Sequence, residues 1–81
     1  MNEQLKRLDD IVERVAKGDE RGFGCLSGGE RVYVALAANS QRLLDEENYT
    51  MVQAWLRLDQ DWRQHLVRTW RSFDPDYFRL L

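Results

Sequence analysis

The chain has 81 residues, of which 43% are hydrophobic and 32% charged, so it fits one globular domain and not a disordered chain. Twelve basic and 14 acidic residues give a net charge of −2, which weighs against a protein that coats DNA or RNA. The one cysteine, Cys25, excludes a disulfide framework and a cysteine-rich zinc site.

The longest apolar run covers residues 32–38, far short of the ~20 residues that a membrane helix needs. The N-terminus carries Asp9 and Asp10 before any apolar stretch, which is unlike a signal peptide. We therefore expect a cytoplasmic protein without a membrane segment.

Residues 2–17 have the pattern of an amphipathic helix. Leu5, Leu8, Val12 and Val15 recur at steps of three and four residues, which places them on one face of a helix. Gly18 is a suitable end, because glycine tolerates the left-handed backbone found after a helix C-terminus.

A second helix is predicted over residues 28–38. Ser27 and Glu30 have the spacing of a capping box, in which each side chain accepts a hydrogen bond from the other residue's amide. The following run, residues 32–38, is apolar on nearly all sides, so this helix should be central and touched by several neighbours.

The segment Leu26-Ser27-Gly28-Gly29-Glu30-Arg31 resembles the signature segment of ATP-binding cassette ATPases, whose turn touches a nucleotide phosphate. However, the chain has no phosphate-binding loop, since none of its five glycines is followed by a lysine. Helix capping alone accounts for Ser27 and Glu30, so we expect no cofactor here.

The C-terminal half allows two interpretations. Residues 39–49 are predicted to be a polar connector with an extra turn near residues 40–44, and Thr50 and Gln53 then repeat the capping-box spacing. An apolar arc continues in phase from residue 50 to 73, which permits one long helix. Because Asp59 would lie inside that arc and is a good N-cap, we predict two helices, at 50–58 and 60–72.

The fold class predicted from these elements is all-α: a small bundle of about four helices, at approximately 2–17, 28–38, 50–58 and 60–72, in a single domain spanning residues 1–81.

Neither a catalytic nor a metal site is expected. Cys25 and His65 are a candidate nucleophile and base, but nothing in their sequence positions brings them together. The chain also has one histidine, one cysteine and scattered carboxylates, without the spacing of a metal-ligand set.

The aromatic content is large for so small a core, and arginines accompany it. Trp, Tyr and Arg concentrate at protein–protein contacts, so a surplus apolar surface predicts a binding module for an unknown protein partner or for self-association. Its candidate partner-binding residues are Trp70, Phe73, Tyr77, Phe78, Arg63 and Arg71.

Two alternatives remain open from the sequence. The aromatic residues and the C-terminal segment could all fold back onto the protein's own core. Alternatively, the helix at 60–72 could be the second helix of a helix-turn-helix that reads nucleic acid, although the charge balance makes such a partner the less favoured one. Its reading face would comprise Gln60, Arg63, Gln64, Arg68 and Arg71.

Overall fold

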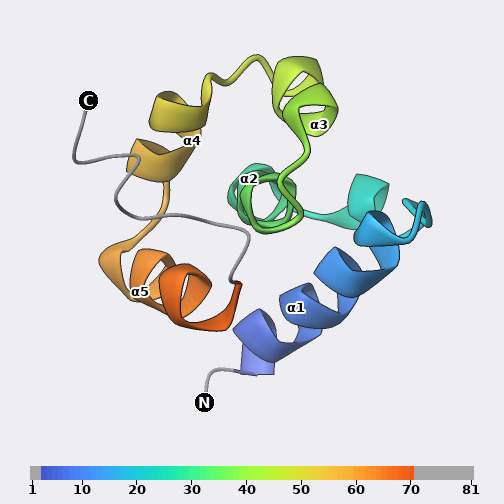
Figure 1. Cartoon of the computed structure of the whole chain (residues 1–81), viewed down its shortest axis with the longest axis horizontal. Helices are drawn as coiled ribbons and strands as arrows, with labels where there is room; N and C mark the ends of the chain where they lie inside the picture. Colours follow the sequence, from blue (N-terminus) through green and yellow to red (C-terminus); the bar gives the residue numbers. More distant parts are fainter. Residues whose placement is uncertain (1–2, 71–81) are drawn as a thin grey trace.

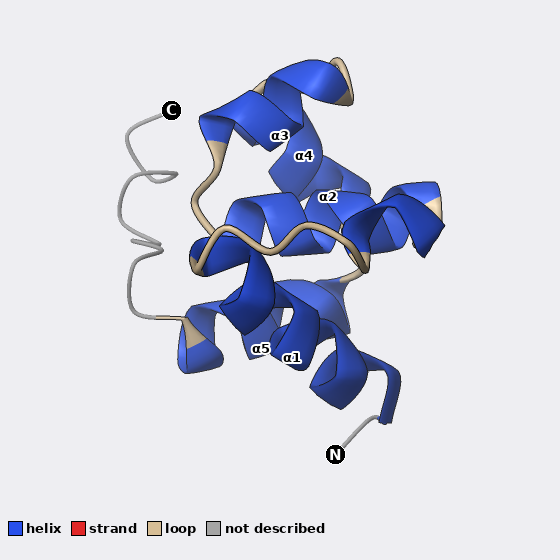
Figure 2. Ribbon diagram, turned by 90° about the vertical axis from the view of Figure 1, so that its right-hand side faces the viewer, coloured by secondary structure: helices blue, strands red, loops and turns tan. Residues whose placement is uncertain are grey.

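A computed structural model describes residues 3–70, and all of their regular structure is helical (Figure 2). The predicted all-α bundle is therefore confirmed. The elements are α1 (Glu3–Ala16), the 3-10 turn η1 (Phe23–Cys25), α2 (Gly28–Ala37), α3 (Gln41–Glu46), α4 (Met51–Arg57) and α5 (Gln60–Thr69).

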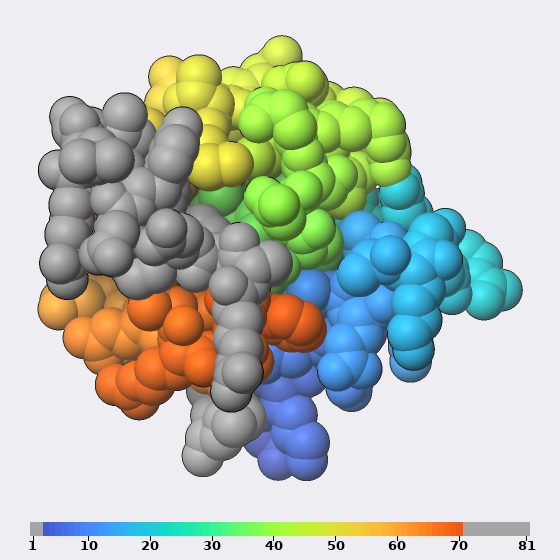
Figure 3. All heavy atoms as spheres, viewed as in Figure 1, coloured from blue at the N-terminus to red at the C-terminus, as the bar shows by residue number. Residues whose placement is uncertain are grey.

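The second helix lies at the centre of the bundle, as its sequence predicts. It contacts α1, α3, α4, α5 and η1, and Figure 1 shows it end-on with the other helices around it. In the space-filling view, α1, the segment around α3 and the end of α5 adjoin one another on the same face (Figure 3). Every residue from Val32 to Leu36 is at most 2% exposed, which explains why this stretch carries no charge.

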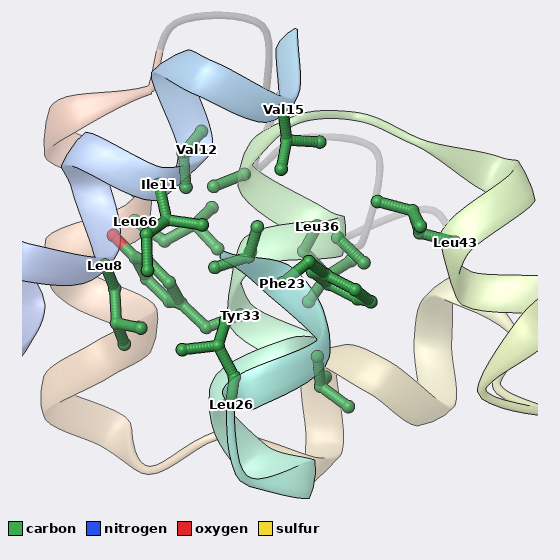
Figure 4. Close-up of a cluster of buried hydrophobic side chains, with 14 of the residues drawn as sticks. Leu8, Ile11, Val12, Val15, Phe23, Leu26, Tyr33, Leu36, Leu43 and Leu66 are labelled. Carbon is green, nitrogen blue, oxygen red and sulfur yellow. The ribbon is translucent and has the colours of Figure 1, made fainter. Parts of the chain in front are cut away.

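The core forms where the apolar stripe of α1 meets α2 and α5. Leu8 and Val12 of α1 are fully buried, and so is Leu66 of α5. Figure 4 shows the Tyr33 ring of α2 among these side chains, with its hydroxyl oxygen pointing towards α1 and α5.

Three consecutive helices end in the same left-handed turn. Gly18 has φ of +95° after α1, and Asn39 and Asn48 have φ of +53° and +63° after α2 and α3. In each turn the next amide closes a Schellman hydrogen bond. The bonds run from Asp19 N to Arg14 O at 2.8 Å, from Ser40 N to Ala35 O at 3.0 Å and from Tyr49 N to Leu44 O at 3.0 Å.

The connector predicted at 39–49 contains a complete short helix, α3. Ser40 caps it by accepting a hydrogen bond from the Leu43 amide, and Leu43 and Leu44 are each 1% exposed. The segment is mainly polar in composition. It nevertheless forms a helix, because Asn39 and Asn48 form the turns at its two ends and Leu43 and Leu44 are buried.

The predicted break at Asp59 is confirmed. Leu58 and Asp59 both have extended backbone between α4 and α5, and the break turns Leu58 into the core while Asp59 remains exposed. The Asp59 carboxylate makes no capping hydrogen bond, unlike the expected N-cap. The last helix also ends earlier than predicted, because Trp70 is already extended, with φ of −110° and ψ of 104°.

The two capping boxes predict a stability ranking. In both, the hydroxyl and the side chain three residues later exchange hydrogen bonds with the backbone. We expect Ser27→Ala and Thr50→Ala each to lower the free energy of unfolding by about 0.5–2 kcal/mol. Asp59→Ala serves as the comparison. Because Asp59 interacts only with the dipole of α5, this substitution should lower the free energy of unfolding by a smaller amount, about 0.3–1 kcal/mol. Urea denaturation measures the free energy of unfolding of all three variants. If Ser27→Ala left that free energy unchanged, the capping assignment would be contradicted.

Candidate functional site

Two of the six residues predicted to bind a partner lie within the described part of the chain. Arg63 is on α5, and Trp70 directly follows α5. The other four, Arg71, Phe73, Tyr77 and Phe78, lie outside the described residues.

The Trp70 indole reaches the first helix. Its Nε1 donates hydrogen bonds to Asp9 Oδ1 at 3.0 Å and to the Tyr33 hydroxyl oxygen at 3.3 Å. The side chain is half-buried against the core, as are those of Trp55 and Trp62. The three indoles are thus packed on the protein itself, while each keeps some exposed surface.

Asp9 is the centre of a polar cluster that joins three helices. Its Oδ1 also accepts a hydrogen bond from the Tyr33 hydroxyl at 2.6 Å, and its Oδ2 lies 2.7 Å from His65 Nε2. We call Asp9, Tyr33, His65 and Trp70 the Asp9 junction. It joins α1, α2 and α5 by side chains up to 61 residues apart in the sequence.

Tyr33 is the fully buried member of the junction. Its ring packs edge to face on Trp62, with centroids 5.6 Å apart, and none of the residue is exposed. Burial raises the pKa of the Tyr33 hydroxyl above its usual value, and the hydrogen bond to Asp9 raises it further. The hydroxyl therefore keeps its proton and acts as a donor.

The His65–Asp9 pair has the arrangement of a histidine oriented by a carboxylate, with side chains 15% and 18% exposed. Such a pair supports nucleophilic catalysis only if a nucleophile lies within hydrogen-bond reach. The hydroxyl of Thr69 lies 3.4 Å from His65 Nε2, on the nitrogen already paired with Asp9. The turn η1, which carries the exposed Cys25, lies on the other side of α2 from α5 (Figure 1). The junction is arranged to hold helices together.

Arg63 caps the C-terminus of α4. Its Nε donates to the Trp55 carbonyl and its Nη2 to the Leu56 carbonyl, both at 2.9 Å. Its guanidinium carbon also lies 5.8 Å from the centre of the Trp55 ring. An arginine predicted to face a partner is therefore fixed in place by the carbonyls of its own neighbouring helix.

Beside Arg63, a shallow hollow of about 260 Å³ opens between α4 and α5. Leu56, which follows Trp55 in α4, is 63% exposed and is the one large apolar residue in the exposed class within residues 3–70. We call this hollow together with Leu56 the α4–α5 surface. The hollow is lined by Trp55, Arg63, Gln64, Val67 and Arg68.

The turn that resembles an ATPase signature carries its own carboxylate. Glu30 Oε1 accepts from the Ser27 amide at 2.9 Å, while Oε2 accepts from Gln4 at 3.1 Å and Arg7 at 3.0 Å. The hydrogen bonds from Ser27 and Gln4 lower the pKa of Glu30 to about 2. A phosphate approaching the same amides would meet this negative charge, so the turn favours capping over phosphate binding.

Within residues 3–70, no group of three or more His, Cys, Asp or Glu side chains is placed to hold a metal ion. None of the helices described is both long and apolar enough to cross a membrane.

Sequence reasoning missed Asp9 as the centre of the junction, although a signal was present. Asp9 lies four residues after Leu5 and three before Val12, at the edge of the apolar arc of α1. A carboxylate in that position needs buried donors, but the sequence does not say which ones.

Removing the Tyr33 hydroxyl tests the junction. Because this hydrogen bond is partly buried and ends on a carboxylate, Tyr33→Phe should lower the free energy of unfolding by about 1.5–3 kcal/mol. Tyr49→Phe is the matched control, since the Tyr49 hydroxyl makes no hydrogen bond within residues 3–70, and its effect should stay within about 0.5 kcal/mol. Equal effects of the two substitutions in urea denaturation would contradict a structural role for the Asp9 junction.

The Glu30 network predicts a dependence of stability on acid. Its pKa is lowered from an ordinary 4.5 to about 2, so its contribution is present above pH 4.5 and is lost as the pH falls towards 2. Glu30→Gln should therefore flatten the loss of stability between about pH 5 and pH 2.5. Glu13→Gln, on the exposed face of α1, is the control. Urea denaturation at about pH 5 and about pH 2.5 should show the same loss of stability for this variant as for the unmodified protein.

No protein-family model, curated protein or solved structure matches the chain.

Proposed function

We propose that this protein is a small, cytoplasmic, non-enzymatic module that binds another protein through the α4–α5 surface and the residues that follow α5. The observation that carries the proposal is the exposure of Leu56, the residue after Trp55 in α4, together with a hollow that Trp55 and Val67 line. Apolar side chains exposed next to arginines are typical of the centre of a protein–protein contact.

The residues singled out from the sequence have different parts in this proposal. Arg63 lines the hollow, whereas the Trp70 indole is hydrogen-bonded to Asp9 of α1 directly after α5. Arg71, Phe73, Tyr77 and Phe78 follow α5 in the sequence, and we propose that they contribute to the same contact.

The charges of α5 favour a protein over nucleic acid as the partner. The exposed side of α5 carries Asp61 as well as Arg68, so its charges balance, whereas a groove-reading helix needs a net positive face. Arg63 is also held by the carbonyls of α4 and is only half exposed. These contacts leave Arg68 as the exposed cation of the described part of α5.

The proposal is tested by making the α4–α5 surface polar. In a Leu56→Ser, Val67→Ser variant, we expect far-ultraviolet circular dichroism to be unchanged, because Leu56 is exposed and Val67 is only partly buried at the edge of the core. Capture of protein from the source cell, or self-association in sedimentation experiments, should be lost. Glu13→Ser, on the exposed face of α1, is the control and should behave as the unmodified protein does.

Two results would overturn the proposal. One is that the double variant captures the same proteins, or self-associates as strongly, as the unmodified chain. The other is capture of nucleic acid whose amount falls steeply as salt rises, which is the mark of phosphate binding by counterion release.

A further inference from the structure

The size of the hollow between α4 and α5 indicates what it can accept. Its volume of about 260 Å³ lies below the roughly 300–1,000 Å³ of pockets that enclose small molecules. A site of this size, open on one side, suits a single large side chain of a partner. The apolar part of its lining, Trp55 and Val67, favours an aromatic or leucine side chain.

The charges around the hollow are of one sign. Among the described residues, Arg63 and Arg68 line it and no carboxylate does. Within residues 3–70, Arg68 makes no hydrogen bond or ion pair and its side chain is exposed. The nearest exposed acid on α5 is Asp61, seven residues earlier, or about 10 Å away along the helix axis at ~1.5 Å per residue. Among the described residues of α5, no acid would therefore compete with a carboxylate bound beside Val67 for Arg68.

From this complementarity we propose that the hollow binds an acidic peptide segment of a partner protein, in which one large apolar side chain is flanked by aspartates or glutamates. The apolar side chain enters between Trp55 and Val67, and the carboxylates pair with Arg68 and the edge of Arg63. Because this names the partner chemistry of the α4–α5 surface, it rests on the function proposed above.

The probe is a synthetic nine-residue peptide with one central phenylalanine and two aspartates on each side. Two control peptides carry serine in place of phenylalanine, or lysine in place of the aspartates. Titrations of the isotopically labelled full chain, followed by ¹H–¹⁵N spectra, should shift the signals of Trp55, Val67 and Arg68. Both control peptides should bind at least about tenfold more weakly.

Protein variants locate the binding. Arg68→Glu should weaken binding of the aspartate peptide by about tenfold or more, because it replaces attraction by repulsion. Arg14→Glu makes the same charge change on the exposed face of α1 and should alter the affinity by less than about twofold.

Binding of all three peptides with equal affinity, or shifts confined to residues outside the hollow, would overturn the proposal. So would binding of the aspartate peptide only after Phe73, Tyr77 and Phe78 are changed to serine, since the occupant would then be the chain's own C-terminal segment. If the aspartate peptide does not bind while capture of a partner protein still depends on Leu56 and Val67, the proposed protein-binding function stands. The proposal that the bound segment is acidic would then be wrong.

Discussion

The Tyr33 hydroxyl lies at the centre of a bundle of short helices, and burying it requires an acceptor. Asp9 supplies that acceptor from α1, and the same carboxylate accepts a hydrogen bond from Trp70, directly after α5, and pairs with His65 of α5. One charged group is thus partnered from two other helices, the condition under which a partly buried carboxylate is tolerated. The position of α5 and the extended backbone at Trp70 bring His65 and Trp70 within hydrogen-bond distance of the Asp9 carboxylate.

The helices of the bundle are short, and their ends are stabilised by local hydrogen bonds. They contain 6–14 residues, lengths at which an isolated helix is marginal in water. Three side-chain N-caps, at Ser27, Ser40 and Thr50, and three left-handed turns satisfy the terminal amides and carbonyls. Burial around α2 then supplies the apolar contacts that short helices lack individually.

The features predictable from the sequence are those with a local cause. Periodicity located α1, capping boxes located the starts of α2 and α4, and Asp59 marked the break before α5. Asp9, by contrast, is paired with residues 24, 56 and 61 positions away, and no local pattern specifies such contacts. The sequence likewise does not indicate the hydrogen bond between Trp70 and Asp9, because that bond exists only once α1 and α5 are side by side.

The two polar features of the bundle therefore differ in what they can offer a ligand. In the Asp9 junction, the buried donors and acceptors bind one another, so little is left for an outside molecule. In the α4–α5 surface, Arg63 of α5 joins the end of α4 through the Trp55 and Leu56 carbonyls, and it lines the hollow together with Val67 and Arg68. A surface already held in shape loses less conformational freedom on binding, so even a small apolar contact there can contribute usefully to affinity.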